Sequence, residues 1–209
     1  MIVPALLTND KNELTQMLDV CSKFADFVQI DIMDGKFVPS RSLDKDEIRK
    51  LRSSLRCEAH LMVNNPLEWL DAFKDFGAER IIFHFEIEDE KEHIIEEIRK
   101  KGFGVGLAVN PSTSLDEFES LVSKVDLILF MSVVPGFYGS KFIPSVLDKI
   151  RKFRRIYPHK KTGIDGGVKL DNVRIIKDTG VDCICVGSAI LKSTSPYKAY
   201  ERFLDICNE

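Results

Sequence analysis

Polar and apolar residues alternate along residues 27–33, near the start of the chain. In an extended strand the even positions of this segment, all Val or Ile, fall on one face, and Gln29, Asp31 and Met33 fall on the other. Two interpretations explain such a polar face: an edge strand with one side in water, or a buried strand that lines a functional site. An Asp-Gly turn then ends the strand, and α/β enzymes place reactive carboxylates at this end of their strands.

The rest of the chain repeats the order of one strand followed by one helix, eight times in all. The predicted strands cover residues 2–7, 27–33, 57–63, 80–86, 104–110, 126–133, 161–165 and 183–186. The predicted helices cover residues 10–21, 45–55, 66–76, 90–101, 114–122, 142–157, 170–179 and the segment after 188. Dividing 209 residues among eight units gives about 26 residues for each unit.

This strict alternation predicts a parallel sheet with helices packed on its outside. Eight units of this length fit a closed (β/α)8 TIM barrel, formed by a single domain over residues 1–209. The alternative is an open, doubly wound sheet, which usually carries a glycine-rich fingerprint after its first strand. Residues 7–11 hold no such motif. We therefore predict the barrel.

Composition and charge fit an ordinary globular enzyme. Hydrophobic residues make up 44% of the chain and charged residues 30%, and the net charge of −3 gives no electrostatic reason to expect nucleic acid or an anionic membrane as a partner. The N-terminus has no basic region followed by a long apolar run, so we expect a cytoplasmic protein. The five cysteines are expected to be reduced thiols, and the Cys183/Cys185 pair lacks the spacing of a zinc site.

Polar residues gather at the predicted carboxyl ends of the strands, which form one mouth of a barrel. They are Gln29, Asp31, His60, His84, Glu86, Asn110 and Asp165. A lone barrel histidine is usually a core residue, but two carboxylates converging with a histidine indicate chemistry. Asp31, His60 and Asp165 together offer the oxygen and nitrogen donors that divalent metals bind. We interpret His84 and Glu86 as a structural pair.

Glycines follow the last three predicted strands. They are Gly136 and Gly139 after the sixth strand, Gly166 and Gly167 after the seventh, and Gly187 with Ser188 after the eighth. Each alone is explained by a turn. Three such turns side by side let backbone N–H groups approach an anion, and phosphate sites of TIM barrels lie after these strands. The sequence therefore predicts a phosphate-binding site.

The sequence resembles ribulose-phosphate 3-epimerases almost from end to end. The matching segments are IDIMDGKFVPS (30–40), EAHLMVNNP (58–66), FHFE (83–86), GLAVNPSTSLDEF (106–118), MSVVPGFYGSKFIPSVLDKI (131–150), DGGV (165–168) and VGSAI (186–190). The first two segments together with the Pro-Gly-Phe of the fifth are highly specific to that family.

The resemblance implies an isomerase of the pentose phosphate pathway that converts ribulose 5-phosphate to xylulose 5-phosphate. Asp31 and Asp165 are then the two acid/base carboxylates, on opposite faces of the substrate, and Asp31, His60 and Asp165 bind one divalent metal ion (zinc, iron, manganese or magnesium). That ion would act as a Lewis acid toward the enediolate oxygens. The residues implied to line the reacting centre are Met33, Met62 and Met131. The family also implies a homo-oligomer.

The chain departs from the family pattern at five positions. Gln29 stands where the family usually has a metal-binding His, and Ala5 where it has a substrate-contacting Ser. Tyr138 replaces a Gly of the phosphate loop, and Lys36 and Ser40 replace His and Asn. An amide oxygen is a harder and poorer ligand than imidazole, so we expect weaker zinc or iron binding and a shift toward Mn²⁺ or Mg²⁺.

Three hypotheses follow from the match and its departures. The first is a metal-dependent epimerase of ribulose 5-phosphate. The second is an epimerase of another ketose phosphate, such as a hexulose phosphate, and the third is a sugar-phosphate-binding protein that has lost turnover. The related orotidine-phosphate decarboxylase group needs a lysine two residues after the strand aspartate, where this chain has Met33.

Overall fold

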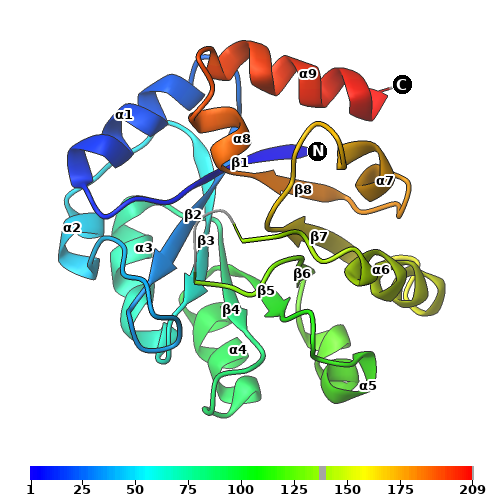
Figure 1. Ribbon diagram of the computed structural model, residues 1–209. Helices are drawn as coiled ribbons and strands as arrows, with labels where there is room; N and C mark the ends of the chain where they lie inside the picture. Colours follow the sequence, from blue (N-terminus) through cyan, green and yellow to red (C-terminus); the bar gives the residue numbers. More distant parts are fainter. Residues whose placement is uncertain (137–139, 209) are drawn as a thin grey trace.

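Eight parallel strands close into a barrel in the computed structural model, which describes residues 1–136 and 140–208 (Figure 1). The strands follow one another around the barrel in sequence order, and β8 pairs with β1 to close it. They are β1 (Ile2–Leu6), β2 (Phe27–Met33), β3 (Arg56–Met62), β4 (Arg80–His84), β5 (Gly104–Val109), β6 (Leu127–Met131), β7 (Lys161–Asp165) and β8 (Cys183–Val186). The predicted (β/α)8 TIM barrel is confirmed.

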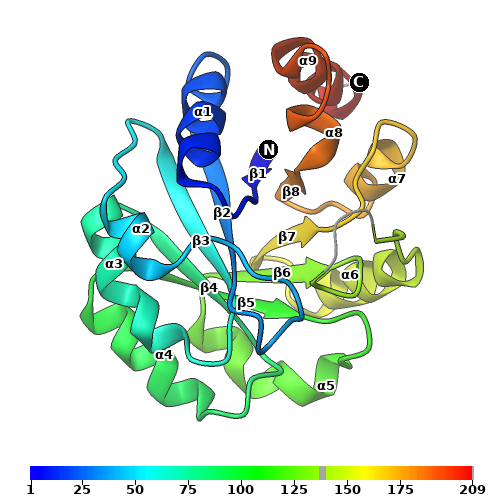
Figure 2. The same cartoon turned by 60° about the vertical axis from the view of Figure 1, so that its left-hand side comes forward.

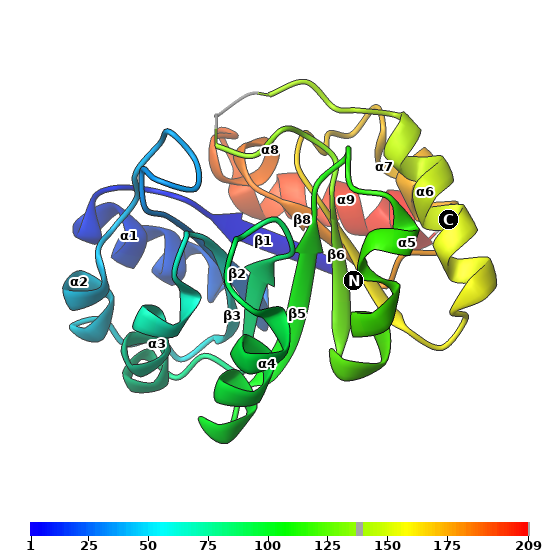
Figure 3. The same ribbon diagram turned by 90° about the horizontal axis from the view of Figure 1, so that it is seen from below.

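Helices surround the barrel on its outside, as Figures 1 and 2 show. The α-helices are α1 (Lys11–Cys21), α2 (Lys45–Arg49), α3 (Leu70–Phe76), α4 (Lys91–Lys100), α5 (Leu115–Phe118), α6 (Ser145–Ile156), α7 (Val173–Lys177), α8 (Ser188–Leu191) and α9 (Pro196–Asn208). Short 3₁₀ segments, Pro66–Trp69 and Glu119–Lys124, precede α3 and follow α5. Helices flank the strands on both sides in the view from below (Figure 3).

Several predicted helices are longer than the observed ones, and local side-chain contacts explain one clear case. The predicted helix 170–179 begins only at Val173, because the Asn172 side chain accepts from the Lys169 N–H and donates to the Gly167 carbonyl. Asn side chains compete in this way with helical backbone hydrogen bonds and favour turns. The predicted last helix divides into two, and Pro196 begins the second, the position at which Pro is tolerated.

The hydrophobic core has two layers that are separated by the strands. The outward-facing residues of the strands, such as Ile30 and Ile32 of β2, pack against the helices in one large cluster. Inside the barrel lies a second cluster, which includes Val3, Leu129 and Cys185. The alternation of β2 therefore has the predicted meaning: its Val and Ile residues face the helices, and its polar residues face the interior.

The described residues contain neither a membrane-spanning helix nor a disulfide bond. No helix in residues 1–136 and 140–208 is long and apolar enough to cross a membrane. The five cysteines are all free thiols, and four of them are buried.

Candidate active site

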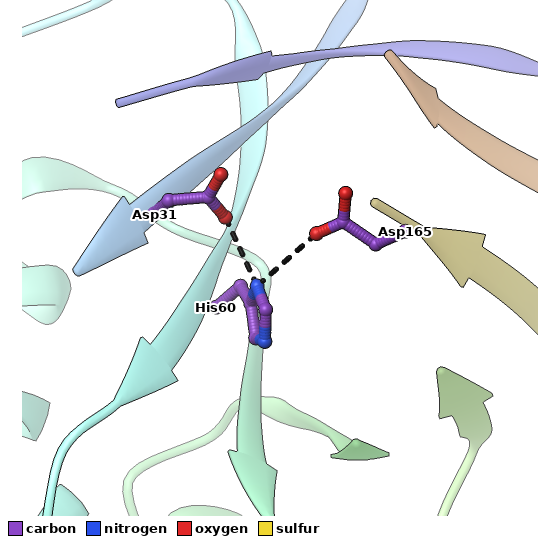
Figure 4. Close-up of side chains that lie close together, drawn as sticks. All are labelled: Asp31, His60 and Asp165. Atoms are coloured by element: carbon purple, nitrogen blue, oxygen red, sulfur yellow. Dashed lines mark hydrogen bonds and ion pairs between the residues drawn. The ribbon is translucent and has the colours of Figure 1, made fainter. Parts of the chain in front are cut away.

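Asp31, His60 and Asp165 come together at the carboxyl ends of β2, β3 and β7 (Figure 4). The Nδ1 atom of His60 lies 3.0 Å from Asp31 Oδ1 and 3.4 Å from Asp165 Oδ2. Figure 4 shows the two carboxylates facing this nitrogen from either side. The sequence predicted that these three residues meet, and the structure brings them together.

Strand register explains why these side chains share one level of the barrel. Asp31 is the direct partner of His60 between β2 and β3, and two residues further on Met33 is the partner of Met62. Between β6 and β7 Met131 pairs with Asp165 in the same way. Side chains two residues apart on a strand point to the same face, so Met33 and Met62 lie one level beyond Asp31 and His60, whereas Met131 lies at the level of Asp165.

Gln29 lies beneath the two aspartates and is fully buried. Its Nε2 atom donates to Asp31 Oδ1 and to Asp165 Oδ2, each at 2.8 Å. Its Oε1 atom accepts from the thiol of Cys185 at 3.2 Å. In this arrangement the amide presents N–H groups to the carboxylates, and its oxygen, the atom able to bind a metal, points away from them.

The electrostatics of the cluster follow from two carboxylates that share one histidine. Burial and the nearby Asp165 charge raise the pKa of Asp31 to about 6, against hydrogen bonds from His60 and Gln29 that lower it. Burial alone would lower the pKa of His60, but hydrogen bonds to Asp165 and Asp31 raise it to about 10. A carboxyl group with a pKa near neutrality suits a catalytic base.

His84 and Glu86 extend the cluster on the far side of His60. The Nε2 atoms of the two histidines are 2.9 Å apart, and His84 Nδ1 lies 3.4 Å from Glu86 Oε2. Burial lowers the pKa of His84 to about 4, so His84 is neutral near pH 7. The two residues do contact each other as predicted. Residue type and spacing did not indicate the additional contact with His60, which lies on another strand.

A cavity of about 240 Å³ opens directly above the aspartates. Asp31 and Asp165 are each 9% exposed and reach its floor. Its apolar lining includes Met33, Met62 and Met131, three nearly buried side chains. The thioether side chains provide a shaped but uncharged wall beside the carboxylates. The cavity therefore combines acid/base groups with space for a small molecule.

The glycines predicted to bind phosphate line the same cavity where the structure describes them. They are Gly136, Gly166 and Gly167, together with Gly187 and Ser188 at the start of α8. Gly166 has a φ of +112°, and a Cβ atom there would lie 2.5 Å from a Val133 methyl group. A side chain at Gly166 would thus strain the backbone and also collide with Val133 in the loop that follows β6. Gly139 and Tyr138 lie outside the described residues.

Other positions that depart from the family pattern are placed as follows. Ala5 lines the cavity. Lys36 is exposed on the β2–α2 connection, and the Ser40 hydroxyl donates to the Gly136 carbonyl. Sequence reasoning overlooked Ser132, whose hydroxyl donates to the carbonyls of Asp165 (3.0 Å) and Gly166 (2.6 Å) and so ties β6 to the end of β7.

The donor set of the cluster fits a divalent cation. Asp31, His60 and Asp165 each direct one ligand atom to a common point, and these atoms lie within 4.8 Å of one another. Carboxylate oxygen and imidazole nitrogen suit zinc, iron and manganese, and carboxylates suit magnesium. The fold and this site define the class of protein: a TIM-barrel enzyme with a paired-carboxylate site and glycine-rich turns at its carboxyl end.

The comparisons with known proteins identify the family within that class. The model of the ribulose-phosphate 3-epimerase family matches residues 1–191, and the chain belongs to this family. Ribulose-phosphate 3-epimerase of Mycobacterium leprae is 34% identical over 205 residues, which is 95% of this chain and 91% of the relative. The cytoplasmic isoform of Oryza sativa is 34% identical over 202 residues, 93% of this chain and 89% of the relative. The chain is therefore an isomerase of the epimerase type.

More distant solved structures share the fold. The 3-hexulose-6-phosphate synthase of Salmonella typhimurium superposes with a TM-score of 0.72 at 17% identity, covering 99% of this chain and 98% of that one. Orotidine 5'-phosphate decarboxylase of Pyrococcus horikoshii gives a TM-score of 0.70 at 16% identity, covering all of both chains. At this level of identity the likeness concerns the barrel alone.

Proposed function

We propose that the enzyme epimerises ribulose 5-phosphate to xylulose 5-phosphate at the carbon next to the ketone. The observation that carries the proposal is the pair of carboxylates, Asp31 and Asp165, facing each other on the floor of one cavity. Inversion at a carbon requires that a proton leave one face and return to the other. Two acid/base groups on opposite sides of the substrate meet this requirement without moving it.

The two carboxylates divide the proton transfers between them. One removes the proton from the carbon next to the ketone, and the other delivers a proton to the opposite face of the resulting enediolate. The raised pKa of Asp31, about 6, suits both tasks near pH 7, because the group is ionised often enough to accept a proton and acidic enough to return it. In the reverse reaction the roles exchange.

Asp31, His60 and Asp165 would hold one divalent metal ion. Such an ion supplies Lewis-acid stabilisation of negative charge on the substrate oxygens. Gln29 is the fourth group at the site, and an amide oxygen is a harder and weaker ligand than imidazole. We therefore propose weaker binding of zinc or iron than in family members with His at this position, and a relative preference for Mn²⁺ or Mg²⁺.

The phosphate group of the substrate would bind at the glycine-rich side of the cavity. Gly166 and Gly167 follow β7, and Gly187 and Ser188 follow β8, so backbone N–H groups from two neighbouring turns border the same space. Exposed amide groups of such turns bind phosphate oxygens. In this proposal the phosphate lies beside Asp165, and the sugar carbons lie on the methionine-lined side.

Ala5 favours a second candidate, an epimerase of another ketose phosphate such as a hexulose phosphate. Ala5 lines the cavity where the family usually has a hydroxyl group, so one polar contact with the substrate is absent.

We also propose, from family membership, a homo-oligomer in the cytoplasm.

The test is product formation from purified protein supplied with Zn²⁺, Mn²⁺ or Mg²⁺ in turn. Ribulose 5-phosphate and a hexulose phosphate are offered separately, and epimers are separated by chromatography. Xylulose 5-phosphate formation supports the first proposal, and turnover of the hexulose phosphate alone supports the second. Asp31→Asn and Asp165→Asn should each lose turnover, and Asp171→Asn, at an exposed aspartate away from the cavity, is their matched control. Absence of turnover with both sugars and all three metals would contradict both proposals.

A further inference from the structure

We propose that the side-chain amide of Gln29 makes a half-turn when a divalent cation enters the site, and that Cys185 serves as its hydrogen-bond partner in both orientations. The inference rests on the proposed metal site, but it does not depend on which sugar phosphate is the substrate. It assigns a role to two buried residues, Gln29 and Cys185, that the acid/base chemistry does not use.

The tip of the Gln29 amide belongs to the same group of atoms as the three candidate ligands. Its Nε2 atom is 2.8 Å from Asp31 Oδ1 and 2.8 Å from Asp165 Oδ2. These are the same two oxygens that His60 Nδ1 approaches at 3.0 and 3.4 Å. The amide nitrogen therefore occupies a fourth position around the point on which the ligand atoms converge.

An amide nitrogen cannot be a ligand in this position. It carries two protons and offers no free lone pair, so it satisfies the carboxylates but would repel a cation placed between them. The amide oxygen is a suitable ligand for hard divalent cations. A half-turn about the last side-chain bond exchanges oxygen and nitrogen with almost no change in shape.

The charge in the site decides which orientation is stable. Without a cation the turned amide would place its oxygen against two carboxylate oxygens, which repel it, whereas the NH₂ group donates to both. With a cation between the carboxylates the preference reverses, because the oxygen then faces positive charge. Gln29 is fully buried, so water cannot compensate for the unfavourable orientation.

Cys185 gives the end of the amide that faces it a hydrogen-bond partner in either orientation. Its thiol donates to Gln29 Oε1 at 3.2 Å, and the side chain is 1% exposed in the apolar interior cluster of the barrel. A thiol is a weak donor and its sulfur a weak acceptor, so the same group can accept from the NH₂ after the turn.

The composition of the chain allows the turn to be observed directly. The chain has two glutamines, Gln16 and Gln29, so protein labelled with ¹⁵N at glutamine side chains gives two NH₂ signals in a proton–nitrogen spectrum. Gln16 is exposed on α1 and serves as an internal control. Zn²⁺ alone is the probe, with no sugar phosphate present, and the His60 ring signals report whether it has bound.

Before Zn²⁺ is added, we expect slow hydrogen exchange and displaced proton shifts for Gln29, because both N–H groups donate to carboxylates. As Zn²⁺ displaces the His60 signals, the Gln29 pair should move and exchange faster, while Gln16 stays unchanged. An unmoved Gln29 pair alongside displaced His60 signals would overturn the proposal. Failure of Zn²⁺ to move the His60 signals would overturn it as well.

The partner role of Cys185 has its own readout in the infrared S–H stretching band. The Zn²⁺-induced difference spectrum should show this band moving to higher frequency, since the S–H group stops donating to the amide oxygen. Cys185→Ser assigns the band by removing it, and because a hydroxyl also donates and accepts, this variant should retain the Gln29 response in the ¹⁵N spectrum. Loss of the Gln29 response in Cys185→Ser, or a band that does not move, would contradict the role.

Affinity separates a turning ligand from an amide that only blocks the site. Gln29→Met keeps a similar volume but lacks both the oxygen and the NH₂ group, and we expect Zn²⁺ to bind about tenfold or more weakly. Unchanged or tighter binding would mean that the amide does not become a ligand. These measurements use metal alone, so failure of the epimerase proposal would appear as absent turnover with the Gln29 response intact.

Discussion

The two ends of the barrel hold buried carboxylates in opposite ways. At the amino-terminal end Glu58, 1% exposed, forms an ion pair of 2.5 Å with Arg80. At the carboxyl end Asp31 and Asp165 have one histidine between them and share the NH₂ group of Gln29. One end gives a carboxylate its own cation, and the other leaves two carboxylates short of positive charge.

The ion pair at the amino-terminal end serves stability, whereas the carboxylates at the carboxyl end serve catalysis. The guanidinium of Arg80 also lies 5.9 Å from the centre of the Phe27 ring. At the amino-terminal end the buried carboxylate is therefore neutralised by a cation that also contacts an aromatic ring. At the carboxyl end burial and, after it, repulsion from Asp165 raise the pKa of Asp31, which is the property that a catalytic base needs. Because its two carboxylates have too few positive partners, the carboxyl end is also suited to bind a cation.

The largest predicted effect is on the activity of the carboxyl end. In Asp165→Asn one of the two proton-transfer groups is lost, and we expect the epimerisation rate to fall about 10²- to 10⁴-fold. The free energy of unfolding should change little, because the lost attraction to His60 is offset by the removal of a charge that repels Asp31. Steady-state kinetics and urea denaturation measure the two effects. A variant that lost stability but kept its rate would invert the comparison.

A change at the amino-terminal end should lower stability and leave the activity nearly unchanged. Arg80→Met leaves Glu58 buried without its partner, which costs about 3–5 kcal/mol of unfolding free energy. The turnover number of the folded fraction should stay close to that of the unaltered enzyme. The double variant Glu58→Met with Arg80→Met should recover part of the loss, since no unpaired charge remains.

Lowering the pH should reduce the loss of unfolding free energy in Arg80→Met, and this tests whether the unpaired charge of Glu58 causes the loss. Burial raises the pKa of Glu58 even in the intact protein, and removal of the Arg80 attraction raises it further. A carboxyl group with a raised folded-state pKa binds its proton more tightly when folded, so stability increases as pH falls from the folded toward the unfolded pKa. A loss that stays constant from pH 7 to pH 5 would mean that packing, and not the buried charge, is responsible.

A moderate effect is predicted for Gln29→His. Imidazole is a better zinc ligand than an amide oxygen, so the zinc dissociation constant should decrease by about tenfold or more. Competition with a coloured chelator measures the change, and Gln16→His on the exposed face of α1 controls for a histidine added elsewhere. Equal zinc affinity in Gln29→His and the parent protein would show that this side chain does not face the metal.

The smallest effect is expected for the exposed ion pair beside the buried one. Arg56 and Glu79 lie 2.6 Å apart, but their side chains are 66% and 44% exposed. Exposed pairs of this kind contribute little, because water and salt screen them. Arg56→Ala should leave the urea midpoint nearly unchanged. A loss as large as that of Arg80→Met would show that exposure does not explain the difference.

The sequence predicted the strands better than the helices. β2, β7 and β8 have the predicted bounds, because alternating or continuous β-branched residues set the strands and short turns end them. The predicted helix 45–55 stops at Arg49, since hydrophobic spacing shows which side of a helix is buried but not where its last turn ends. The start of α7 depends on Asn172, a contact that periodicity does not reveal.

The site divides along the same line. Asp31, His60 and Asp165 were predictable as a group, because parallel strands bring their carboxyl ends to one rim. The contact of Gln29 with Cys185 joins residues 156 positions apart and depends on the closing of β8 onto β1. The stacking of His60 on His84 likewise depends on side-chain directions inside the barrel. Residue type alone gave no signal for either contact.

The most direct test of the central claim is hydrogen exchange from heavy water in two matched variants. Asp31→Asn and Asp165→Asn, each checked for retained metal, are incubated separately with ribulose 5-phosphate and with xylulose 5-phosphate. If each carboxylate serves one face, each variant should introduce deuterium next to the ketone of one epimer only, and the two variants should prefer opposite epimers. Loss of exchange for both epimers in one variant, with both retained in the other, would contradict the two-carboxylate account.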